Sequence, residues 1–202
     1  MSAPVETQDW VSRWQRVARR IRVPLGFATA ALYLYELWRH TPEPAAVAWS
    51  LALVIPGLWL RGYASGYVKK NQELTVAGPY AHVRNPLYLG SILIAAGFAV
   101  ALESWAVGAA LAAMFVAIYV PVIASEERFL RATFAEFDEY CRRVPRLIPR
   151  LTPARMPGRE GGGRFFLPLY LKHREYNALL GAALLYTGML YLKPVLNALQ
   201  HR

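Results

Sequence analysis

Residues 86–124 read PLYLGSILIAAGFAVALESWAVGAALAAMFVAIYVPVIA and contain one charged side chain, that of Glu103. The run is about twice as long as the roughly 20 apolar residues that one helix needs to cross a bilayer. Because Glu103 lies near its middle, the run predicts two helices, 86–102 and 104–124, joined by a tight turn. Buried helices of soluble proteins are usually shorter and keep a polar face, so this hairpin indicates a membrane protein.

Three more stretches are strongly apolar and lack Lys and Arg, namely residues 23–38, 45–60 and 176–192. The chain of 202 residues is 55% hydrophobic, more than is typical of a soluble domain of this size. The predicted fold is therefore an all-α polytopic membrane protein with about five transmembrane helices and with cytosolic helices that cap a site.

The positive charges predict how these helices are oriented. Of 23 Lys and Arg residues, twenty lie in the N-terminal segment and in the two polar segments that follow the second and fourth helices. By the positive-inside rule, these segments and the N-terminus are cytosolic and the C-terminus is outside. We expect an integral protein of the cytoplasmic membrane in a bacterium, or of the endoplasmic reticulum in a eukaryote. Topology and anionic lipids explain the net charge of +10, so no nucleic acid partner is expected.

Composition divides the chain into four parts. The first carries tryptophans and aliphatic residues at helical spacing among arginines, which is typical of a helix lying on the membrane surface. The predicted parts are an interfacial helix (1–22), a membrane core (23–149), a cytosolic linker and interfacial segment (150–175) and a C-terminal transmembrane helix (176–202).

The single cysteine, Cys141, allows neither a disulfide nor a Cys-based zinc site, and no metal is expected.

Two polar stretches flank the hairpin. They are GPYAHVRNPLYLG at 78–90 and SEERFLRATFAEFDEYCRRVPRLIP at 125–149. The first stretch precedes the hairpin and the second follows it, so both lie on the same predicted side of the membrane. Topology therefore predicts that they lie close together. Glu126 and Glu127 come at the end of a predicted span, where an ionised carboxylate usually has a partner or a ligand. Arg84 or a cationic ligand would provide one.

Purely structural roles also fit these residues. Asn85 and Pro86 suit the first positions of a helix. Arg84 and the neighbouring tyrosines suit the membrane interface. Ser125 would cap a helix whose first turn carries two acids. Taken singly, none of these residues requires a catalytic role.

Together, the two stretches resemble the isoprenylcysteine carboxyl methyltransferase and phospholipid methyltransferase superfamily over roughly residues 74–149. That family carries G-P-Y-x-x-x-R-H-P-x-Y-x-G, a helical hairpin, a Glu-Glu pair, and then F-x-x-Y-x-x-Y with a stretch like R-V-P. This chain departs from the pattern at Asn85, where the family commonly has His. Asn can form hydrogen bonds, but it does not titrate near neutral pH.

The resemblance implies an integral membrane enzyme that transfers a methyl group from S-adenosyl-L-methionine to a lipophilic acceptor. The acceptor would be an isoprenylcysteine carboxylate, a phospholipid amine or another hydrophobic small molecule. Arg84 would bind the cofactor carboxylate, and Glu126 or Glu127 its ammonium group or a ribose hydroxyl. The implied catalytic residues are Arg84, Glu127, His82 and Asn85. The implied cofactor-binding residues are Gly78, Pro79, Tyr80, His82, Arg84, Asn85, Pro86, Tyr88, Glu126, Glu127, Tyr140 and Arg143.

Two alternatives remain at the level of sequence. The stretch from Tyr140 to Pro145 also resembles membrane sterol reductases, which bind NADPH, although those proteins tend to be longer and usually have Asp-Glu at the acidic pair. A non-enzymatic membrane scaffold or transport component would explain the helices and the charges. It would not explain why the acidic pair Glu126-Glu127 occurs together with the stretch Arg84-Asn85-Pro86.

Overall fold

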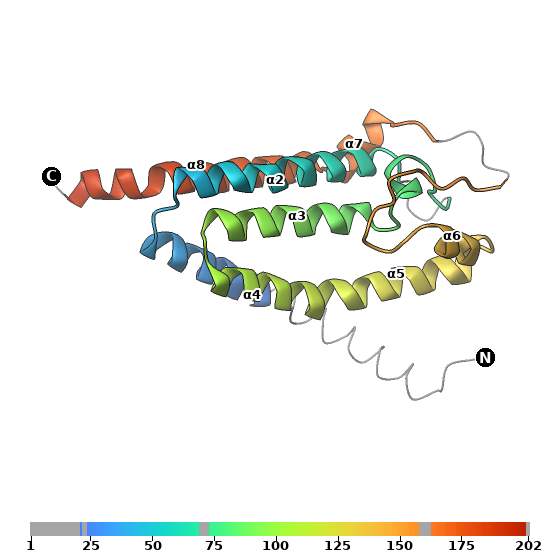
Figure 1. Ribbon diagram of the computed structural model, residues 1–202, viewed down its shortest axis with the longest axis horizontal. Coiled ribbons are helices and arrows are strands. Elements are labelled where there is room, and N and C mark those ends of the chain that lie inside the picture. The colour runs from blue at the N-terminus through green and yellow to red at the C-terminus, as the bar shows by residue number, and fades with distance from the viewer. Residues whose placement is uncertain (1–20, 22–23, 69–72, 158–162, 201–202) are drawn as a thin grey trace.

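The computed structural model describes residue 21 and residues 24–68, 73–157 and 163–200. Every regular element among these residues is a helix, and they contain no strand, as the sequence predicts (Figure 1). Most of the predicted interfacial helix, 1–22, lies outside the described residues. In chain order, the helices are 24–39, α2 (Pro44–Ser65), η1 (Gly78–Ala81), α3 (Pro86–Ala101), α4 (Trp105–Met114), η2 (Phe115–Tyr119), α5 (Val120–Thr133), α6 (Phe137–Arg143), α7 (Leu167–His173) and α8 (Tyr176–Gln200).

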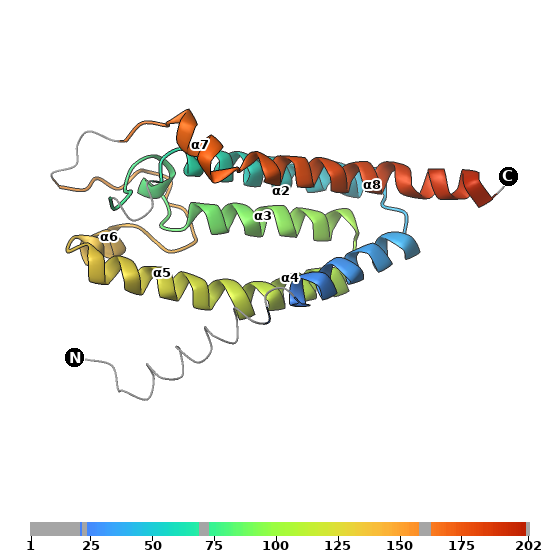
Figure 2. The same cartoon turned by 180° about the vertical axis from the view of Figure 1, so that it is seen from behind.

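Helices occupy all five predicted apolar ranges, and the long ones run along the length of the molecule (Figures 1 and 2). By length and composition, α2 and the continuous helix Trp105–Thr133 could each cross a membrane. Helix α3 is apolar but has only 16 residues. The number of spans and their orientation therefore stay predictions.

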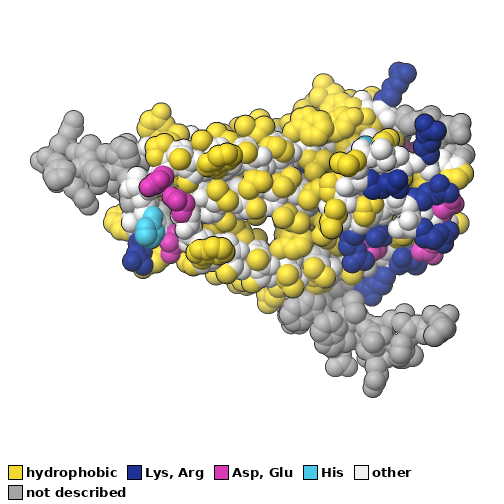
Figure 3. All heavy atoms as spheres, viewed as in Figure 1, with side chains coloured by type: hydrophobic (Ala, Val, Ile, Leu, Met, Phe, Trp, Pro, Cys, Tyr) yellow, Lys and Arg dark blue, Asp and Glu magenta, His cyan; other side chains and the backbone are white. Residues whose placement is uncertain are grey.

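The surface supports membrane association. One face shows a broad apolar middle, with most Lys and Arg side chains gathered at one end (Figure 3). Trp49 on α2 is 72% exposed and Leu184 on α8 is 73% exposed. Large apolar side chains exposed over several helices mark a surface that contacts lipid or another apolar partner.

Glycines bring α2 into close contact with α3, the first helix of the hairpin. A Cβ atom built on Gly90 would lie 2.7 Å from the carbonyl oxygen of Gly57, and one on Gly97 would lie 2.9 Å from that of Ser50. Arg61 on α2 also donates to Ser91 on α3 and forms two 3.0 Å hydrogen bonds with Glu175, which lies between α7 and α8. Small residues and one guanidinium group thus hold α2 and α3 together, and the guanidinium group also binds the turn that precedes α8.

The second arm of the hairpin is one long bent helix. The turn after α3 is tight, as predicted, with Glu103 in the left-handed region at a φ of 51°. A π-helical turn, η2, separates α4 from α5 directly before Pro121, whose missing N–H prevents a normal helical bond. The structural interpretation of Ser125 as a helix cap was wrong, because the helix continues to Thr133.

Candidate functional site

A short 3₁₀ helix leads the chain into the site. Gly78 begins η1 at a φ of +59°, in the left-handed region that favours glycine. A Cβ atom there would lie 2.6 Å from the ring of Tyr67, so both backbone and space require glycine. The chain then passes through 82–85 and enters α3 at Pro86, which puts Arg84 at the polar end of the hairpin.

Backbone hydrogen bonds join this entry to the segment after α6. Arg84 N donates to Pro145 O at 2.9 Å, Arg150 N to His82 O at 2.9 Å, and Ala154 N to Ala81 O at 2.8 Å. The two polar stretches that flank the hairpin therefore meet in space, as topology predicts.

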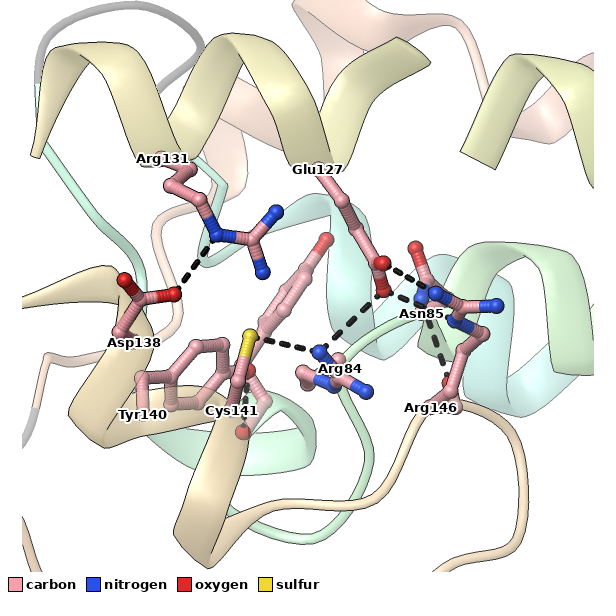
Figure 4. Close-up of polar contacts among 9 residues, drawn as sticks. Arg84, Asn85, Glu127, Arg131, Asp138, Tyr140, Cys141 and Arg146 are labelled. Carbon is pink, nitrogen blue, oxygen red and sulfur yellow. Dashed lines mark hydrogen bonds and ion pairs between the residues drawn. The ribbon is translucent and has the colours of Figure 1, made fainter. Parts of the chain in front are cut away.

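Glu127 is the buried centre of this meeting point (Figure 4). Its side chain is 8% exposed, and it projects from α5 between two guanidinium groups. Arg84 Nη1 lies 3.3 Å from Oε1, and Arg146 Nε donates to the same oxygen at 3.0 Å, with a second Arg146 contact to Oε2. The carboxylate is thus fully engaged by an arginine from each flanking segment.

The three charges sum to +1, which favours an anion. Arg84 also donates from Nη1 to the Sγ of Cys141 on α6. Its Nε is buried and has no hydrogen-bond partner among the described residues. A buried N–H without an acceptor costs free energy, and an anionic oxygen from a ligand would satisfy it.

Tyr140 closes the site from α6. Its hydroxyl donates to Tyr80 O at 2.8 Å, and both rings are buried. Burial raises the pKa of both phenols, so both are neutral at physiological pH. Tyr140 therefore acts as a hydrogen-bond donor that fixes η1.

Four polar side chains line the rest of the site. The hydroxyl of Tyr88 donates to Oε1 of the exposed Glu126 at 3.0 Å. His82 Nδ1 lies 2.8 Å from Arg150 O. Asn85 occupies the cap position of α3 but makes no capping bond, because its side-chain amide donates to Arg146 O at 3.2 Å.

The structure therefore brings most of the predicted set together and leaves out Arg143. That residue pairs with Glu139 at 2.7 Å and donates to Arg155 O, outside the Glu127 contacts. Sequence reasoning missed Arg146 and Cys141. Arg146 lies in the quoted RVPRLIP stretch, where a second arginine three residues after Arg143 was the available signal. The catalytic and cofactor-binding roles of all these residues stay predictions.

A family model matches the part of the chain that contains much of this site. Residues 46–136 match the phospholipid methyltransferase family. The resemblance predicted from the sequence is thereby confirmed, and the match lies within the isoprenylcysteine carboxyl methyltransferase-like superfamily. The phospholipid methyltransferase match includes Arg84 and Glu127, whereas Tyr140 and Arg146 lie beyond it.

Two curated relatives share part of the sequence. The chain is 46% identical over 88 residues to the cobalt-zinc-cadmium resistance protein CzcN of Cupriavidus metallidurans. It is 41% identical over 88 residues to the nickel-cobalt-cadmium resistance protein NccN of Alcaligenes xylosoxydans xylosoxydans. Each alignment covers 44% of this chain and 40% of the relative, so the match spans about two fifths of each relative's length. No solved structure matches the chain.

Proposed function

We propose that the protein is a membrane methyltransferase that uses S-adenosyl-L-methionine to methylate a lipophilic acceptor. The observation that carries the proposal is the buried Glu127, held between Arg84 and Arg146 inside a site that the phospholipid methyltransferase match partly covers. A buried carboxylate with two arginines at the mouth of an apolar hairpin is costly to maintain without a ligand-related purpose.

The residues present fit the cofactor. S-adenosyl-L-methionine carries an activated methyl group on a sulfonium, together with a carboxylate, an ammonium group and an adenosine. The unpartnered Nε of Arg84 suits the carboxylate, since a guanidinium group forms strong hydrogen bonds with carboxylate oxygens. Glu126 is exposed and accepts from Tyr88, so it is better placed than the fully engaged Glu127 to take the ammonium group.

The chain's own part in methyl transfer is to orient the acceptor and exclude water, since the leaving group needs little further activation. A carboxylate acceptor needs no base, whereas an amine must lose a proton. Arg150 O only accepts hydrogen bonds, so His82 donates to it from Nδ1, which leaves Nε2 as the ring nitrogen available to the site. His82 is therefore the candidate base at a site where Asn85 cannot titrate.

The alternatives receive less support. The family match is to methyltransferases, which does not favour the NADPH-dependent reductase. The relatives' names concern metal resistance, but the described residues contain no group of three or more His, Cys, Asp or Glu that could hold a metal ion. A methyltransferase within a metal-resistance system is compatible with both observations.

Calorimetric binding of S-adenosylhomocysteine and of NADPH to the detergent-purified protein tests this function. We expect S-adenosylhomocysteine to bind and Arg84→Gln to abolish that binding. Arg128→Gln is the matched control, because Arg128 is an exposed neighbour of Glu127 that donates to Ala124 O and does not contact the carboxylate. NADPH binding instead would favour the reductase, and binding of neither ligand by folded protein would favour the scaffold.

A further inference from the structure

The end of α6 and the segment after it combine many positive charges with exposed apolar side chains. Residues 142–155 contain five arginines and no acidic residue. Within them, Ile148 is 81% exposed and Leu151 is 99% exposed. Large aliphatic side chains this exposed in a polar segment need an explanation, because water contact with them is unfavourable.

Residues 146–151, which we call the 146–151 loop, lie at the polar end of the hairpin. The loop turns back from α6 toward the beginning of α3 (Figure 1). Pro145 O accepts from Arg84 N, and Arg146 O accepts from the side chain of Asn85, so the loop starts beside the first residue of α3. Apolar tips flanked by arginines at this level match the boundary between lipid headgroups and acyl chains.

We propose that the 146–151 loop docks onto an anionic lipid bilayer. Ile148 and Leu151 enter the headgroup–acyl boundary. Two exposed arginines contact lipid phosphates, namely Arg142 at the end of α6 and Arg150, whose Nη1 also donates to Arg143 O. Each arginine near an anionic surface adds about fivefold to lipid affinity. Two aliphatic tips form too small a surface for a stable protein–protein interface, which favours lipid as the partner.

Docking also bears on the site. The side chain of Arg146 pairs with Glu127, and backbone carbonyls of the same segment hold Arg84, Asn85 and His82. Lipid contact that fixes the loop therefore fixes these partners as well. This link between docking and the site rests on the proposed function, since it is measured as cofactor affinity. The docking of the loop onto lipid does not rest on the proposed function.

Nitroxide labels in nanodiscs test the docking without any use of activity. In a Cys141→Ser background, the label is attached at Leu151→Cys or, as a control, at Ala135→Cys in the exposed turn between α5 and α6. With phosphatidylglycerol mixed into phosphatidylcholine, we expect the label at 151 to be reached by oxygen and shielded from a water-soluble nickel complex. The label at 135 should show the reverse. Equal nickel access at both positions would overturn the proposal.

A second measurement addresses the link to the site. The double variant Ile148→Ser/Leu151→Ser should bind S-adenosylhomocysteine several-fold more weakly than the unaltered protein in the anionic nanodiscs, and with equal affinity in detergent. Equal affinity in both media would overturn the link. If no variant binds S-adenosylhomocysteine in any medium, the proposed function fails, while the label measurement still decides the docking.

Discussion

The carboxylate of Glu127 pairs with the guanidinium groups of both Arg84 and Arg146, which lie 62 positions apart in the chain. Arg84 was one of the two partners expected from sequence, the other being a cationic ligand, because an acid at membrane depth usually has a cation nearby. Arg146 could not be distinguished from Arg143, since both lie in a basic stretch whose path depends on the backbone pairing with 81–84. That pairing is long-range and leaves no local pattern in the sequence.

Tyr140 allows a prediction about pH at the residue scale. Burial raises the pKa of its phenol above the ordinary value of about 10, so the folded state favours the neutral form. Its stabilising contribution is complete below about pH 10 and is lost as pH rises through the raised value. Tyr140→Phe should be less stable than the unaltered protein at pH 7 by about 1 kcal/mol, because the hydrogen bond to Tyr80 O is lost.

The difference between the two proteins should narrow above about pH 10, since Phe cannot titrate. Thermal unfolding in detergent across the alkaline range measures it. Tyr191→Phe, at a position 62% exposed on α8, is the control. A difference in midpoint that does not change with pH would contradict this account of Tyr140.

Among the elements, the π-helical turn η2 influences which acid of the Glu126–Glu127 pair faces the site. It adds one residue to the helix before Glu126 and Glu127, which rotates the following turns by about 100°. As a result, Glu127 is buried while Glu126 is exposed beside Tyr88. A sequence that predicts only a regular helix cannot decide which acid faces inward, and Pro121 is the local signal that was available.

The close contact of α2 and α3 gives a prediction about packing. Gly90→Ala should lower the thermal midpoint, because its Cβ atom would clash with Gly57 O and with the side chain of Arg61, at an overpacking cost of about 1–3 kcal/mol. Gly108→Ala is the matched control on α4, where the added atom meets only the Cβ of Ala99 at an ordinary 3.8 Å.

Gly108→Ala should leave the midpoint unchanged or raise it, since alanine favours helices more than glycine does. The two variants are compared by thermal unfolding in the same detergent. Equal thermal midpoints for the two variants would mean that α2 and α3 pack less closely than they do in the structure.

For the whole molecule, the hairpin, the all-α fold and the meeting of the two polar stretches could be predicted from sequence. Hydropathy and one central charge at Glu103 define two antiparallel helices, and antiparallel helices bring their outer ends together. The length of α5 could not be predicted in the same way, because its polar half after Ala124 resembles a cytosolic segment in composition.

The predicted orientation can be tested in intact cells. In a Cys141→Ser background, Glu103→Cys should react with an impermeant maleimide from outside, whereas Ala135→Cys should react only after the cells are permeabilised. The reason is that the two positions lie at opposite ends of the long helix Trp105–Thr133. The reverse labelling pattern would place the candidate site on the outer face.

The shortness of α3 has a consequence for the membrane around the protein. At 1.5 Å per residue, its 16 residues extend about 24 Å, whereas the hydrocarbon layer is about 30 Å thick. In the topology that we predict, either the bilayer thins beside α3 or Arg84 lies a few ångströms below the hydrocarbon edge. The water content around Arg84 and Glu127 is then set partly by acyl-chain length, so that membrane thickness becomes a variable of the reaction.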